Sequence, residues 1–490
     1  MRMLCNLSRN ISRARNTVSR FNSIMSQKNV QLRAASPYER RLAIREELNF
    51  YNAMVLGAVY EFSDPKFNVK SIRSFVRPLK SIIEKHAFMG VVLNGKDTES
   101  PVWERVPSVK LDNHITILDE AQNPDELFWI EKALPTIVDT RTSGPSPPWR
   151  VYVLPLLPKN GRPCAFVAFA MSHSIGDGGA AIVFLQALRE ALQQSSGVDN
   201  NFEVVVPERE LPEPFDTPER LPISPEFLKS IMSSSVVGAG TWTGSKVFMS
   251  EGGLQTKIRM LEVQPQHVEA ALQAARVHGT KLTPLIHQLI VRALSKVVVD
   301  KNVQDFASTT AFDLRSASGV GLEWGLYISG HSASHPRVSP SSSISSDEWQ
   351  SARTLSKKLG EVASTLDNQV IGMLRFVPNH KESMTSKIGS TRDASYALSN
   401  MLAFDGGKAE DSVRTTKLIV TSSAAVPSAP LSFCLISVKG GSLVCTLNWQ
   451  PGALGVPLEK EDAFINGICS SLKADFANLE QAVKAPRARI

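Results

Sequence analysis

The sequence has few cysteines and no long apolar segment, and each shortage argues against a class of protein. Its five cysteines are scattered over 490 residues without a Cys-x-x-Cys pair, which disfavours a disulfide framework or a zinc site. The longest apolar runs, Val151–Pro158 and Ala165–Met171, are strand-sized and far shorter than the roughly 18 residues that cross a membrane. We therefore expect a globular protein with no metal and no transmembrane helix, although attachment to a membrane surface stays open.

Negative charge is missing from the beginning of the chain. Residues 1–35 hold no acidic residue but seven of the 54 basic ones, and the remaining chain carries 47 basic and 47 acidic residues. A neutral body lacks the basic surface that follows nucleic-acid phosphates, so we expect no nucleic-acid partner.

The basic segment 1–35 admits three interpretations. Its Arg- and Ser-rich, acid-free composition is typical of a mitochondrial presequence, and it lacks the apolar core of a secretory signal. It is equally compatible with a basic tail on a cytoplasmic protein, or with a second start site at Met25. We expect a cytoplasmic protein, with mitochondrial targeting by residues 1–35 as the alternative.

Strand and helix patterns alternate on both sides of a proline-rich segment, which predicts two α/β units. Residues 206–225 contain six prolines and are expected to link an N-terminal subdomain, 36–205, to a C-terminal subdomain, 226–490. Apolar spacing and turn residues predict the individual elements. The expected helices are 39–48, 72–86, 178–193, 267–277, 284–299 and 463–477. The expected strands are 50–60, 90–93, 151–157, 165–171, 431–438 and 443–449.

The most informative segment follows the apolar strand 165–171. It reads Ser172-His173-Ser174-Ile175-Gly176-Asp177-Gly178-Gly179 and leads directly into a predicted helix. Glycines at 176, 178 and 179 are expected to allow a tight turn with unusual dihedral angles. A neutral imidazole at the strand end can take a proton from an alcohol or thiol, and such general-base help contributes roughly 10²–10⁴-fold.

Asp177 has a different expected role. Its carboxylate can pair with an arginine and hold the loop that aims His173, without touching the substrate. The alternative is purely structural: His173 would be an ordinary strand-end residue, and Asp177 would cap the following helix.

These residues resemble the active-site motif of the chloramphenicol acetyltransferase-like superfamily, which includes plant BAHD acyltransferases and peptide-synthetase condensation domains. More closely, the chain from about Ser36 to about Leu479 resembles the fungal alcohol acetyltransferase family. The similar strings are, in order, Glu39–Asn52 with its R-x-x-L-x-F-Y part from Arg45, Pro147–Arg150, Leu282–His287, Asp313–Arg315, Ser399–Asn400 and Trp449–Gly452.

The resemblance implies a fold of two α/β subdomains, each a mixed sheet with flanking helices, and an active-site tunnel between them. Acyl-CoA and an alcohol would enter from opposite sides and meet at His173, with Asp177 as the second motif residue. The chain departs from two groups of relatives. Condensation domains have two adjacent histidines, and the first of them is replaced by Ser172 here. Plant BAHD enzymes carry a D-F-G-W-G motif, and this string does not occur in the sequence. The family's Asn-x-Gly string is also altered, to Asn400-Met401-Leu402.

Other histidines and one serine string are weaker candidates. The string Gly330–Ser334 lacks the last glycine of a hydrolase G-x-S-x-G elbow. His331 and His335 have the spacing of two zinc ligands but lie among Ser and Gly residues, and His287 is expected to be a satisfied core histidine.

We therefore predict an acyl-CoA-dependent O-acyltransferase, of the acetyl-CoA:alcohol O-acetyltransferase type. His173 acts as the base, and the glycine-rich loop with Asp177 supports it. Arg315 pairs with Asp177, contacts a CoA phosphate, or is an ordinary surface residue. Acyl-CoA is expected as a co-substrate with no permanently bound cofactor, and the protein is expected to be a monomer. The alternatives are an N-acyltransferase acting on an amine and a non-catalytic scaffold of the same fold.

Overall fold

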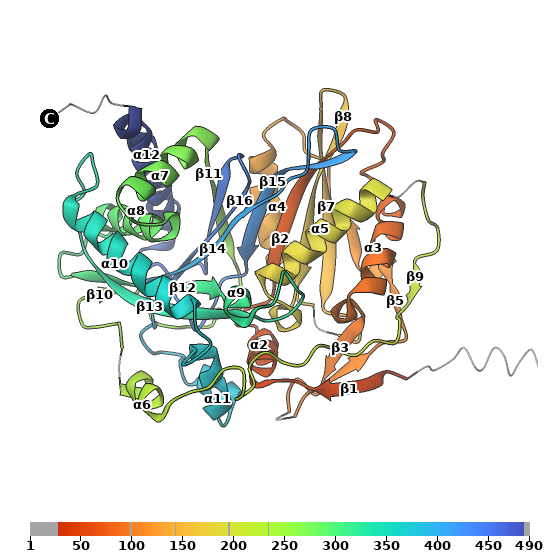
Figure 1. The fold of residues 1–490 in the computed structure, drawn as a ribbon, viewed down its shortest axis with the longest axis horizontal. Coiled ribbons are helices and arrows are strands. Elements are labelled where there is room, and N and C mark those ends of the chain that lie inside the picture. Colours follow the sequence, from red (N-terminus) through yellow and green to blue (C-terminus); the bar gives the residue numbers. More distant parts are fainter. Residues whose placement is uncertain (1–27, 99, 143, 195–196, 234, 485–490) are drawn as a thin grey trace, which may run out of the picture.

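The structure is a computed structural model that describes residues 28–484 apart from 99, 143, 195, 196 and 234. Two mixed sheets lie side by side and form the two halves of the molecule (Figure 1). No helix in the described ranges is long and apolar enough to cross a membrane. Most of the basic tail, including Met25, lies outside the described residues.

A five-stranded sheet forms the half on the right of Figure 1. Its strand order is β15 (Val413–Ser422), β2 (Met54–Phe62), β8 (Arg162–Met171), β7 (Trp149–Lys159) and β6 (Ile115–Ile117). One face packs on α3 (Arg73–Lys85) and α5 (Gly178–Gln194), and the other on α4 (Glu126–Asp139). Because β8 is buried on both faces, it is apolar along nearly its whole length.

The second half is built on a seven-stranded sheet. Its order is β10 (Thr241–Trp242), β12 (Asp305–Asp313), β14 (Tyr396–Phe404), β16 (Leu431–Val438), β17 (Leu443–Trp449) and β11 (Lys257–Val263), with β13 (Ile328–Pro336) paired to β12. Its core is shared with α7 (Pro265–Val277), α8 (Leu282–Val297) and α12 (Glu461–Lys484). The remaining helices are α2 (Pro37–Glu47), α6 (Pro225–Ser233), α9 (Arg315–Ser318), α10 (Ser346–Ala363) and α11 (His380–Thr385).

The two halves exchange a strand. β15 comes from the C-terminal part of the sequence but pairs antiparallel with β2 in the N-terminal sheet, from Val413 opposite Phe62 to Ser422 opposite Met54. A division of the chain at residues 206–225 thus does not coincide with the division between the sheets. The subdomain boundaries 36–205, 206–225 and 226–490 stay a prediction.

The end of the basic segment and the proline-rich segment both pack against the first helix. A three-stranded sheet pairs β1 (Val30–Ala34), β4 (Val102–Arg105) and β3 (Val91–Asn94), so the last residues of the expected tail form a strand. Arg33 on β1 donates to Glu39 and to the carbonyl of Pro212, and the Tyr38 N–H donates to Asp216. Directly before the predicted linker, β9 (Glu203–Val205) pairs with β5 (Ser108–Lys110).

Local sequence signals explain where the elements begin and turn. Ser36 caps α2 in a capping box with Glu39, and Pro37 occupies the first helical position. Asn160 and Gly161, both with positive φ, form the two-residue turn of the β7–β8 hairpin. The predicted helices and strands are present with ends displaced by at most four residues, except that the last helix, α12, continues seven residues beyond its expected end.

Candidate active site

The loop between β8 and α5 carries the predicted site residues. After Met171 the chain forms a single 3₁₀ turn, η3 (His173–Ile175), in which the Ser172 hydroxyl accepts from the Ser174 N–H. The Ile175 carbonyl accepts from the Trp324 indole at 2.7 Å, and the Asp177 N–H donates to the Gly325 carbonyl. The loop is therefore fastened to a segment of the other half of the molecule.

Asp177 is completely buried and fully hydrogen-bonded. Arg315 donates to both carboxylate oxygens, at 2.8 and 3.0 Å, and the Tyr327 N–H donates at 2.8 Å. The Ala180 N–H also donates to Asp177, which makes this carboxylate the cap of α5. Both structural roles considered for Asp177 are thus present, and Arg315 pairs with it rather than lying on the surface.

The glycines of the loop have a different role from the expected one. None of Gly176, Gly178 and Gly179 has a φ in the left-handed region, so the expectation of unusual dihedral angles is wrong. The loop instead needs glycine because there is no space for a side chain. A Cβ at Gly179 would lie 2.5 Å from the Arg315 guanidinium, and one at Gly176 would lie 2.6 Å from the Ala180 methyl group.

His173 is partly exposed and has a positively charged neighbour in Arg45. Its Nδ1 atom is buried and forms no hydrogen bond of ordinary geometry within the described residues. Withdrawal from water and the Arg45 charge together lower the pKa of His173 from 6.5 to about 4, while the backbone of His173 and Gly176 and the charge of Asp177 act in the opposite direction. The imidazole is therefore neutral at pH 7 and able to accept a proton.

Two residues near His173 escaped the sequence analysis of the site. The Tyr51 ring lies 6.0 Å from the His173 ring, centre to centre, and the Arg45 guanidinium carbon lies 3.9 Å from the centre of the Tyr51 ring. Burial raises the pKa of Tyr51 to about 12, so its phenol is neutral. Both stand in the string Arg45–Asn52 that carried the family resemblance, and α2 packs directly on η3. That string was the signal for a role at the site.

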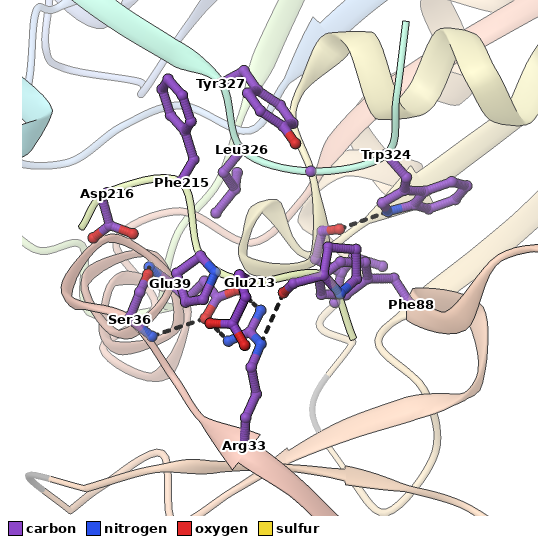
Figure 2. Close-up of a pocket in the computed structure, with 14 residues that line it drawn as sticks. Arg33, Ser36, Glu39, Phe88, Glu213, Phe215, Asp216, Trp324, Leu326 and Tyr327 are labelled. Carbon is purple, nitrogen blue, oxygen red and sulfur yellow. Dashed lines mark hydrogen bonds and ion pairs between the residues drawn. The ribbon is translucent and has the colours of Figure 1, made fainter. Parts of the chain in front are cut away.

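A small cavity adjoins the loop but is not lined by His173. It holds about 20 Å³, roughly the space of one water molecule, and is lined by Ile175, Trp324 and part of the proline-rich segment. Figure 2 shows Arg33 and Glu39 bonded at one side of this cavity and the Trp324 indole at the other. A larger groove of about 350 Å³ lies between α4 and β11 and also does not include His173. The tunnel expected at His173 stays a prediction.

Comparison with solved structures defines the fold first. The TRI3 trichothecene 15-O-acetyltransferase of Fusarium sporotrichioides superposes with a TM-score of 0.64 at 12% identity, over 91% of this chain and 95% of that one. The condensation domain of the polyketide synthase MokA superposes with a TM-score of 0.57 at 11% identity, over 93% and 99% of the two chains. The fold is thus the predicted chloramphenicol acetyltransferase-like fold with two α/β halves.

The sequence comparison then gives the family. The family model for alcohol acetyltransferases matches residues 42–465, and the chain belongs to this family. It is 21% identical over 469 residues to the probable alcohol acetyltransferase crmB of Aspergillus fumigatus, covering 88% of this chain and 96% of the relative. The protein is therefore an acyltransferase, as the sequence predicted.

Proposed function

We propose that the protein transfers an acetyl group from acetyl-CoA to the hydroxyl group of a small-molecule alcohol, with His173 as general base. The observation that carries this proposal is the partly exposed, neutral imidazole at the end of β8, on a loop that Asp177 and Arg315 hold in place. Its support from relatives is that the matching family is named for alcohol acetylation, and that a structural neighbour, TRI101 of F. sporotrichioides, was crystallised with coenzyme A and T-2.

The reaction proceeds by direct transfer. The acceptor oxygen attacks the thioester carbonyl while the imidazole of His173 takes the hydroxyl proton, and a tetrahedral oxyanion forms. That intermediate then breaks its C–S bond, and the imidazolium returns the proton to the departing CoA thiolate. The products are an acetate ester and CoA-SH, and His173 is neutral again.

Substrates are proposed to reach His173 along the junction of the two sheets. Trp324 and Gly325 come from the C-terminal half and contact the loop that carries His173. A ligand bound there should stabilise the folded protein by mass action, by about 2.7 kcal/mol at one hundred times its dissociation constant. Acetyl-CoA should therefore raise the melting temperature, and an unchanged melting curve at saturating acetyl-CoA would contradict the donor assignment.

The direct test measures CoA thiol release from acetyl-CoA with and without acceptors. Thiol release should be slow alone and faster with members of a panel of primary alcohols, with the ester identified by mass spectrometry. Each alcohol is matched by the amine of the same skeleton. Amides formed in place of esters would indicate an N-acyltransferase, and no acceleration by any acceptor would favour a non-catalytic scaffold.

A further inference from the structure

One helix face beside His173 carries two arginines that form no close ion pair with any described residue. Arg41 and Arg45 are four residues apart on α2, so they lie on the same face of the helix. This helix packs against η3, and Tyr51 contacts both the Arg45 guanidinium and the His173 ring. The face therefore belongs to the immediate surroundings of the proposed general base.

Within the described residues, neither Arg41 nor Arg45 has an ion pair at salt-bridge distance, and the buried Nε atom of Arg45 has no hydrogen-bond partner. The carboxylates whose charges act on the two arginines have other partners. Glu46, which acts on Arg45, accepts from the Thr142 hydroxyl at 2.7 Å, and Asp393, which acts on Arg41, pairs with Lys387. Because Arg41 and Arg45 are partly exposed, an anion from outside the protein can pair with them.

The buried arginines of the described residues have protein partners. Arg292 pairs with Glu348 and Asp475, Arg315 pairs with Asp177 and Asp313, and Arg392 donates to backbone carbonyls. The partly exposed Arg45 guanidinium instead lies over the face of the Tyr51 ring. Burial lowers the pKa of Arg45 to about 10, and the charge of Arg41 lowers it as well, which still leaves both side chains protonated at pH 7.

We propose that Arg45, with Arg41 beside it, binds a carboxylate carried by the substrate close to its reacting carbon. This inference rests on the acyltransferase function proposed above and specifies its substrate class. A guanidinium fixed on an aromatic face presents its N–H groups in a plane and suits a carboxylate in two-point contact. The phosphates of CoA do not fit this place, because the whole pantetheine arm separates them from the thiol that must lie at His173.

The carboxylate can come from either substrate. A hydroxy acid would bring it with the acceptor, and a dicarboxylic acyl group such as succinyl would bring it with the thioester. The shared chemistry is an anion held a short distance from the reacting centre, and the experiment separates the two sources.

The first arm pairs acetyl-CoA with 3-hydroxybutanoate or with 3-hydroxybutanamide, which has nearly the same shape without the charge. The second arm pairs a neutral alcohol with succinyl-CoA or with butanoyl-CoA. In one arm we expect kcat/KM for the charged substrate to exceed that of its neutral match by about tenfold to a hundredfold, the range of a charged hydrogen bond. Equal rates within both pairs overturn the proposal.

Variants identify the residue responsible. Arg45→Met should remove the preference, measured as the ratio of kcat/KM between the charged and neutral members of a pair, and Arg45→Lys should restore part of it. Arg276→Met, an exposed arginine on α7, is the matched control and should leave the preference unchanged. A preference that survives in Arg45→Met places the anion elsewhere and refutes the assignment.

A binding measurement separates this inference from the proposed reaction. If no pair of substrates releases CoA thiol, the acyltransferase proposal fails, and anion binding is then judged by thermal melting alone. Sodium succinate should raise the melting temperature of the wild-type protein more than succinamide does, and this difference should disappear in Arg45→Met. The same response to both compounds in the wild-type protein refutes the anion site.

Discussion

Two histidines of this protein, His173 and His287, have a lowered pKa because they are withdrawn from water, although His287 is fully buried and His173 is partly exposed. They differ in their hydrogen bonds. His287 on α8 bonds the Tyr396 hydroxyl through Nδ1, at 2.8 Å, and the Thr310 hydroxyl through Nε2, at 3.0 Å. The Nδ1 atom of His173 bonds no other side chain of the described residues, and Arg45 is a cationic neighbour. A low pKa alone therefore does not single out the proposed general base.

The same contrast separates the two residues of the motif. Asp177 resembles His287, because protein groups already satisfy its carboxylate. A substrate cannot form a strong hydrogen bond with a carboxylate whose hydrogen-bonding capacity is already used by the protein. We therefore assign chemistry to His173 and loop geometry to Asp177, and the following experiments test that division from the largest expected effect to the smallest.

Removing the imidazole of His173 should have the largest effect. His173→Ala should lower kcat/KM for acyl transfer by about 10²–10⁴-fold while the melting temperature stays close to that of the wild type. The matched control is His287→Gln, which should cost about 1–3 kcal/mol of folding free energy through unsatisfied hydroxyl groups and leave kcat nearly unchanged. Near-wild-type turnover in His173→Ala would show that another group accepts the proton.

Neutralising Asp177 should affect stability first. Asp177→Asn breaks a buried ion pair and leaves Arg315 without its bidentate partner, so we expect a loss of about 3–5 kcal/mol in urea unfolding. Activity should fall as well, because the loop that aims His173 loses its anchor. Asp313→Asn is the control: this second partner of Arg315 is 50% exposed, and its loss should cost at most about 1 kcal/mol. An Asp177→Asn protein of unchanged stability and low rate would make Asp177 a catalytic group.

The local sequence predicted the strand, loop and helix that carry the candidate site, but it did not predict contacts between distant parts of the chain. The strand, the turn residues and the capping signals around His173 act within a few residues, so the β8–η3–α5 unit could be recognised from pattern alone. The contribution of β15 could not, because its register against β2 pairs residues that are about 350 positions apart in the chain. The environment of Arg45 could not be predicted from the sequence either. A charged residue on a helix is usually solvated, and only the tertiary structure shows that Arg45 forms no close ion pair with a described residue.

The pH dependence of the rate tests whether His173 is the general base. His173 has a pKa of about 4 in the folded protein against 6.5 ordinarily, so it stays neutral well below pH 6.5. We expect kcat/KM to be level from pH 7 to about 5 and to fall as the pH approaches 4. Between 6.5 and 4 the unfolded chain binds more protons than the folded one, so stability is present above this window and decreases as the pH falls through it.

His114, His335 and His380 shift in the same direction, each to about 4, and therefore add to the acid sensitivity of the fold. Circular dichroism at each pH must show that the protein is still folded where the rate is measured. A rate that titrates near 6.5 in folded protein would mean that the general base is solvated, or is another group.

The smallest expected effect tests whether the Arg315–Asp177 ion pair holds the His173 loop in place. Gly179→Ala would bring a methyl group 2.5 Å from the Arg315 guanidinium, which Asp177, Asp313 and the Glu323 carbonyl hold fixed, so we expect a loss of about 1–3 kcal/mol. Gly178→Ala would bring its methyl group equally close to the Met401 sulfur, but a methionine side chain can move away, and the loss should stay below about 1 kcal/mol. Thermal melting compares the two variants directly. If Gly179→Ala also lowers kcat and Gly178→Ala does not, the Arg315–Asp177 pair sets the position of His173. Equal losses of stability in both variants would show instead that the loop tolerates no side chain at either position, whichever residue lies opposite.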